Sequence, residues 1–112
     1  EWLRGNEKIA KQLINIKNSK KIIFYSPITK AEIYHGLRSG EENKTMDFFI
    51  SCISLSINDE IGKKAGLYLA QYHKSHSLSL GDALIAATCN IHKITLFTLN
   101  KKHYPMKDIE FI

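Results

Sequence analysis

One short segment, residues 78–87, constrains the fold more than any other, because it has the pattern of a helix start with almost no polar face. The run from Ala83 to Ala87 is entirely apolar, and a helix of this kind must be packed on most of its sides. Ser79 suits the N-cap, which places Asp82 at the third helical position, facing free backbone N–H groups. Capping is the common reason for such an aspartate, yet a carboxylate in so apolar a setting needs a partner. Asp82 is therefore a candidate functional residue.

The rest of the chain alternates between helical and extended patterns. Helices are expected at residues 7–17, from Thr29 to about 38, at 43–50, from a cap at 58–60 to about 72, and from Ser79 to about 90. Strands are expected at residues 22–25, 53–57, 94–99 and 109–112, and a polar connection at 73–77. This alternation predicts an α/β fold, with a mainly parallel central sheet covered by helices on both faces in three layers.

Three polar side chains are expected at one edge of that sheet. Glu32 starts the helix after the first strand, Asp82 starts the helix before the 94–99 strand, and Asn100 follows that strand. In a parallel sheet, strand C-termini and helix N-termini share the edge where ligands bind. Two carboxylates and an amide form an oxygen-rich site suited to Mg²⁺ or Mn²⁺, which can activate a water against a phosphate.

Glu32 and several neighbouring candidates also have a plainer interpretation. Thr29 as N-cap and Glu32 three residues later would form a capping box, with Ile28 and Ile33 as a hydrophobic staple. Ser26 and Thr98 end strands at the same edge, where a hydroxyl could orient a water or a carboxylate, although a turn or a cap explains them as well. The loop residues that could contact flanking phosphates, or could simply be solvated, are Lys101, Lys102 and His103.

Length, charge and composition narrow the class of protein to which this chain can belong. At 112 residues the chain is expected to form a single domain, and its formal charge of +5 favours a polyanionic partner such as RNA. No apolar run is long enough for a membrane span, and no signal peptide is recognisable, which favours the cytoplasm. Cys52 and Cys89 have the pattern of reduced, buried thiols, with no disulfide expected. The chain starts at Glu1 without a methionine, so we expect a fragment truncated at its N-terminus.

Three stretches together resemble PIN-domain ribonucleases of the VapC toxin type. They are residues 26–37 (SPITKAEIYHGL), 80–87 (LGDALIAA) and 96–104 (LFTLNKKHY), in the order and at the approximate separations of that family. The resemblance implies a metal-dependent endoribonuclease, usually homodimeric, that an antitoxin protein silences. It implies that Glu32 and Asp82 are metal-site acids and that Thr98 and Asn100 belong to the end-of-strand motif.

The chain departs from this family at two points. The family begins with a strand ending in an aspartate, followed by a helix resembling residues 1–5, and that strand and aspartate are missing here. The resemblance therefore implies that this form is inactive unless residues outside the sequence complete it. Asn100 replaces an acid, which favours one tightly held metal over two.

Two other function classes stay open. A PIN-like module without catalysis could bind RNA or an antitoxin, and the net charge fits that hypothesis equally well. A zinc site could use the spacing of His73 and His76, but no Cys-x-x-Cys accompanies them, and solvated histidines explain them better. Nucleophilic catalysis by Cys89 is disfavoured, because a thiol on so apolar a helix should stay protonated.

Overall fold

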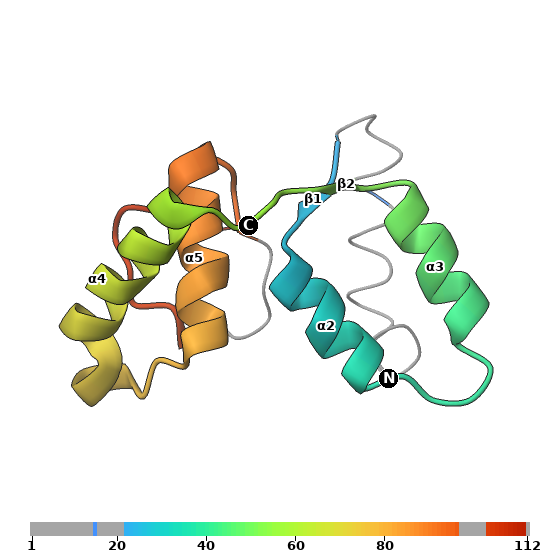
Figure 1. The fold of residues 1–112 in the computed structure, drawn as a ribbon, viewed down its shortest axis with the longest axis horizontal. Helices are drawn as coiled ribbons and strands as arrows, with labels where there is room; N and C mark the ends of the chain where they lie inside the picture. Colours follow the sequence, from blue (N-terminus) through green and yellow to red (C-terminus); the bar gives the residue numbers. More distant parts are fainter. Residues whose placement is uncertain (1–14, 16–21, 97–102, 112) are drawn as a thin grey trace. The chain divides into compact units, whose positions relative to one another are not determined.

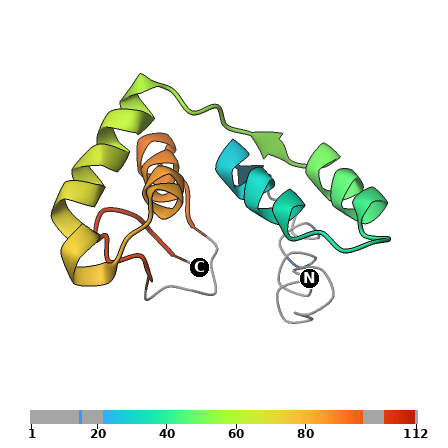
Figure 2. The same cartoon turned by 60° about the horizontal axis from the view of Figure 1, so that its bottom comes forward.

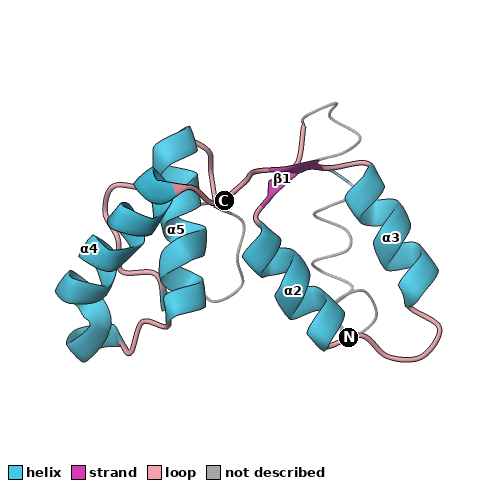
Figure 3. Ribbon diagram, in the orientation of Figure 1, coloured by secondary structure: helices cyan, strands magenta, loops and turns pink. Residues whose placement is uncertain are grey.

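The computed structural model describes residue 15, residues 22–96 and residues 103–111. The fold divides into two compact units, Glu1–Leu55 and Ser56–Ile112. Figure 1 shows the course of the chain, and Figure 3 shows its helices and strands. Most of the predicted 7–17 helix, the end of the 94–99 strand, and Ile112 lie outside the described residues, although Asn15 is helical.

The first unit is built on a short parallel strand pair. Strand β1 (Phe24–Tyr25) pairs in parallel with β2 (Ile53–Ser54), with Phe24 opposite Ile53. The ladder is extended by hydrogen bonds from the Ile53 N–H to the Ile23 carbonyl (2.9 Å) and from the Leu55 N–H to the Tyr25 carbonyl (2.8 Å). The parallel arrangement agrees with the prediction, but both strands are shorter than the sequence pattern indicated.

Helix α2 (Pro27–His35) starts earlier than predicted. Its N-cap is Ser26, whose hydroxyl accepts hydrogen bonds from the N–H groups of Ile28 (3.0 Å) and Thr29 (3.3 Å). Pro27 at the first helical position favours this start, because its missing N–H would be unpaired there anyway. The capping box of Thr29 and Glu32 was therefore wrong: Glu32 lies beyond the first turn.

The predicted hydrophobic staple around this cap was wrong as well. With Ser26 as N-cap, the positions that form a staple are Tyr25 and Lys30 rather than Ile28 and Ile33. The Lys30 ammonium lies 5.9 Å from the Tyr25 ring centroid and 5.5 Å from that of Phe49. A cation–π contact thus stands where the sequence suggested an aliphatic one.

The sequence pattern of helix α3 (Glu42–Ile50) predicts an apolar side made of Met46, Phe49 and Ile50, and of these three only Phe49 is buried. Phe49 and Thr45 are buried, whereas Met46 and Ile50 are 49% and 74% exposed. The Phe49 ring packs against Tyr25 (centroids 4.7 Å apart) and Tyr34 (5.9 Å apart), and these contacts set the helix orientation. In the turn before α3, Glu41 is buried, and its carboxylate accepts a hydrogen bond from the Arg38 N–H at 2.8 Å.

The second unit is a helix pair with a C-terminal segment. Helices α4 (Asp59–His76) and α5 (Leu80–His92) lie side by side in Figures 1 and 2. Asn58 caps α4 through its side chain, which accepts from the Ile61 N–H at 3.0 Å, as predicted. The buried side of α4 carries Ile61, Ala65 and Tyr68. Residues 73–76, expected in a connection, form the last turn of α4, and the C-cap that follows, Ser77, is in the left-handed region (φ 50°).

Helix α5 is packed on most sides, as its composition required, with six buried residues between Ala83 and Cys89. The segment 103–111 returns to the start of the 94–99 stretch, where Leu96 and Phe111 form a parallel bridge. The Leu96 N–H donates to the Glu110 carbonyl at 2.7 Å. Within the described residues, no helix is long and apolar enough to cross a membrane.

Candidate metal site

Asp82 stands where the sequence placed it, at the third position of α5. Its backbone N–H donates to the Ser79 hydroxyl at 3.1 Å, which is the expected cap. Its half-buried carboxylate accepts a hydrogen bond through Oδ1 from the Tyr104 hydroxyl, also at 3.1 Å. The carboxylate therefore has the partner that its apolar surroundings required.

Sequence reasoning did not assign a role to Tyr104. It lies within the stretch that resembles the family, but an aromatic residue after a lysine-rich loop carries no sequence signal for a contact 22 residues back. The ring is 9% exposed, and its centroid lies 6.2 Å from that of Phe111. The contact between Tyr104 and Asp82 depends on how segment 103–111 folds back toward α5.

An aspartate anchors that segment. The Asp108 carboxylate accepts from the Tyr68 hydroxyl at 2.7 Å and pairs with the Lys64 ammonium at 2.8 Å. Burial raises the pKa of Asp108, but the hydrogen bonds from Lys64 and Tyr68 outweigh it and hold the pKa below its ordinary value. Burial, and then the bond to Asp108, raises the pKa of Tyr68. The Asn90 side chain adds a bond to the Asp108 carbonyl at 2.9 Å.

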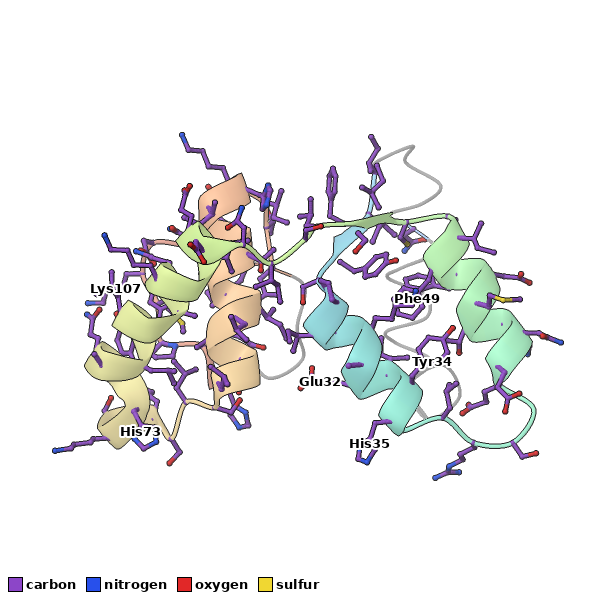
Figure 4. The ribbon with its side chains drawn as sticks, in the orientation of Figure 1. Glu32, Tyr34, His35, Phe49, His73 and Lys107 are labelled. Atoms are coloured by element: carbon purple, nitrogen blue, oxygen red, sulfur yellow. The ribbon has the colours of Figure 1, made fainter. Side chains whose placement is uncertain are left out.

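Glu32 lies on α2 in the first unit and is exposed. Tyr34, two residues later, is on the opposite face of the helix, where its ring is 41% exposed and stacks on the buried ring of Phe49 (Figure 4). Since the capping box does not form, capping no longer explains why a glutamate stands at this position.

The other predicted site residues are only partly described. Ser26 is buried, and its hydroxyl caps the N-terminus of α2, which is the plainer of its two interpretations. His103 is described and exposed. Thr98, Asn100, Lys101 and Lys102 lie outside the described residues. The predicted convergence of Glu32, Asp82 and Asn100 stays a prediction.

The zinc and thiol alternatives gain no support. Across the part of the chain that the structure describes, no three His, Cys, Asp or Glu side chains are grouped to hold a metal, a finding that applies to acidic sites as well as to zinc sites. The His76 ring packs edge-on against Tyr72, with 6.0 Å between centroids. Burial raises the pKa of Cys89 to about 11, so its thiol is protonated at neutral pH. Cys52 is half-buried, less buried than predicted, and neither cysteine forms a disulfide.

The chemistry of Asp82 fits a hard divalent cation. A half-buried carboxylate at a helix start offers oxygen ligands, which Mg²⁺ and Mn²⁺ prefer over nitrogen or sulfur. The Tyr104 hydroxyl occupies one position on Oδ1, and Oδ2 has lone pairs of its own.

Comparison with known proteins agrees with this fold and with the sequence motifs. The sequence model of the PIN domain matches residues 1–109 and so runs through both compact units. The chain belongs to the PIN-domain family.

Its relatives within that family are ribonucleases of the VapC type, as the resemblance implied. Ribonuclease VapC10 of Mycobacterium tuberculosis is 34% identical over 82 residues, a match covering 72% of this chain but only 62% of that protein. Ribonuclease VapC19 of the same organism is 30% identical over 107 residues, covering 95% of this chain and 86% of that protein. These relatives confirm the predicted family type.

A solved structure confirms the fold class. The structure of VapBC-1 from nontypeable Haemophilus influenzae aligns with a TM-score of 0.75 at 20% identity, covering 99% of this chain and 89% of that one. The chain therefore has the PIN-like α/β fold expected from its alternating helices and strands.

Proposed function

We propose that this protein is a metal-dependent endoribonuclease that cleaves RNA phosphodiester bonds. The observation that carries the proposal is the Asp82 carboxylate, held at the start of α5 by Ser79 and Tyr104. It is supported by the family and by relatives that are named ribonucleases. The oxygen chemistry of Asp82 supports Mg²⁺ or Mn²⁺ as the cofactor.

In this proposal Glu32, Asp82 and Asn100 hold the cation. The cation, when bound, supplies an activated water and neutralises charge on the scissile phosphate. Asp82 contributes a carboxylate. Its backbone N–H and its side chain are both hydrogen-bonded, so little reorganisation of this residue is needed to bind the cation. Ser26 supports Glu32 by capping its helix, and Thr98 orients a neighbouring carboxylate or water.

The proposed RNA contacts come from the loop after the 94–99 stretch. Lys101, Lys102 and His103 bind the phosphates that flank the cleaved bond, which places the RNA backbone without reading its bases. The formal charge of +5 supports attraction of a polyanion. We further propose a cognate antitoxin protein as partner, a homodimer and a cytoplasmic location, which rest on the resemblance to the VapC type.

Cleavage of RNA by the full-length protein tests this function. With Mg²⁺ or Mn²⁺ present, we expect cleavage that a chelator abolishes and that Asp82→Asn lowers by roughly 100-fold or more, since the variant lacks the anionic ligand. Asp59→Asn is the matched control, because Asp59 also lies in the first turn of a helix in the same unit. It should cleave like wild type.

Two results would contradict the proposal. Cleavage that survives Asp82→Asn unchanged would exclude the carboxylate mechanism. A complete absence of cleavage, with RNA or antitoxin binding intact, would instead favour a non-catalytic binding module.

A further inference from the structure

The hydrogen bond between Tyr104 and Asp82 joins the returning C-terminal segment to the carboxylate at the start of α5. Tyr104 lies in segment 103–111, and its hydroxyl reaches Oδ1 of Asp82 at 3.1 Å. The donor residue is almost fully buried, at 9% exposed, and the acceptor residue is half-buried. Such a bond restricts rotation of the carboxylate about its Cβ–Cγ bond, because the donor position is fixed.

Segment 103–111 has other anchors of its own. Asp108 is held by Tyr68 at 2.7 Å and by Lys64 at 2.8 Å, and its carbonyl accepts from Asn90. Leu96 and Phe111 add a parallel bridge. The segment that carries Tyr104 is therefore anchored at Asp108 and Phe111 as well, and these anchors stay in place when the Tyr104 hydroxyl is removed.

We propose that Tyr104 is a positioning residue that orients the Asp82 carboxylate for a divalent cation. This inference rests on the proposed function, in which Asp82 is a metal ligand. The Tyr104 hydroxyl takes one lone-pair position on Oδ1 and leaves Oδ2 for the cation. Partners that orient a ligand in this way commonly change metal affinity by about 10–100-fold when they are removed.

The simpler alternative is a buried hydrogen bond that only stabilises the fold. The chain offers a matched control for it, because Tyr68 is also a buried tyrosine, 3% exposed, whose hydroxyl donates to an aspartate in the same unit. Tyr68→Phe removes a bond of the same kind but leaves Lys64 and Asn90 on Asp108. Both Tyr→Phe variants keep the ring and remove one hydroxyl.

The experiment is Mn²⁺ binding to the full-length protein without RNA, followed by electron paramagnetic resonance of the free ion. We expect Tyr104→Phe to raise the dissociation constant of Mn²⁺ by roughly 10-fold or more. Tyr68→Phe should leave that constant within about twofold of wild type, while both variants lower the unfolding midpoint. RNA cleavage by Tyr104→Phe should recover at a high Mn²⁺ concentration, because the variant binds Mn²⁺ more weakly but keeps the residues that carry out the reaction.

The outcomes separate this inference from the function on which it rests. If wild type binds Mn²⁺, Asp82→Asn does not, and Tyr104→Phe binds like wild type, the positioning role is excluded and the metal site stands. An equal loss in Tyr104→Phe and Tyr68→Phe means a structural effect and also excludes it. If wild type does not bind Mn²⁺, or Asp82→Asn binds equally well, both the metal site and the positioning role fail.

Discussion

At the scale of single residues, burial decides which side chains are chemically available. Asp82 and Cys89 lie on the same apolar helix, but Asp82 is at its half-buried start and Cys89 is 6% exposed near its end. Burial raises the pKa of Cys89 from 9.0 to about 11, because the thiolate cannot be solvated there. The carboxylate can meet a ligand, whereas the thiol acts as a small apolar side chain.

This pKa predicts a loss of stability at alkaline pH. The folded protein holds the Cys89 proton more tightly than the unfolded chain does. The resulting contribution to the free energy of unfolding is fully present below about pH 9 and is lost as the pH rises through about 11. Two pKa units correspond to about 3 kcal/mol at most. Urea unfolding of wild type and Cys89→Ala at several pH values measures how the free energy of unfolding depends on pH. The stability difference between them should shrink above pH 9, and a constant difference would contradict the shift.

At the scale of elements, the start of α2 shows how two similar sequence signals compete. Both Ser26 and Thr29 are good N-cap residues, and the glutamate after Thr29 favoured the later start. Pro27 favours the start at Ser26, because its fixed φ suits the first helical position and Ser26 immediately precedes it. The earlier start moves Glu32 away from the helix terminus, so Glu32 has no capping role.

Two alanine substitutions test this boundary. Ser26→Ala removes the acceptor for the N–H groups of Ile28 and Thr29 and should lower the free energy of unfolding by about 1 kcal/mol. Thr29→Ala removes no cap and should change it by less than about 0.5 kcal/mol. Chemical denaturation of both variants gives the comparison. A larger loss for Thr29→Ala would restore the later helix start.

At the scale of the whole molecule, the net charge should influence how strongly the protein attracts RNA. The chain carries 16 Lys and Arg against 11 Asp and Glu, a formal charge of +5 at neutral pH. A positive protein attracts RNA through its phosphates and releases counterions on binding, so affinity depends on salt. Under the proposed function, part of that dependence comes from the loop containing Lys101 and Lys102.

The salt dependence of RNA affinity measures this contribution. In the Asp82→Asn background, which should not cut, the logarithm of the association constant should fall linearly with the logarithm of salt concentration. Replacing Lys101 and Lys102 together by alanine should flatten the slope by about 0.7 for each phosphate that the protein no longer neutralises. The control is Lys63→Ala with Lys74→Ala, which removes equal charge from exposed positions of α4. Equal flattening in both double variants would assign the effect to net charge alone.

Local sequence determined much of this protein. The caps at Asn58 and Ser79, the buried sides of α4 and α5, and the position of Asp82 all follow from patterns within a few residues, where helix periodicity and capping chemistry act. The parallel strand pairing follows from alternating elements, and the family follows from three short motifs. The capping box at Glu32 was wrong, because Pro27 favours the earlier helix start. The predicted apolar side of α3 was right for Phe49, which packs against Tyr25 and Tyr34, and wrong for Met46 and Ile50, which are exposed.

Only the tertiary structure decided the partner of Asp82. Tyr104 meets it because Asp108 is held by residues of α4 and α5, contacts that join positions 18 to 40 residues apart. No local pattern encodes such contacts, since they depend on how the helices pack and where the returning segment is anchored. The sequence by itself determined that a carboxylate stands at the start of a buried helix, and packing decided how that carboxylate is held.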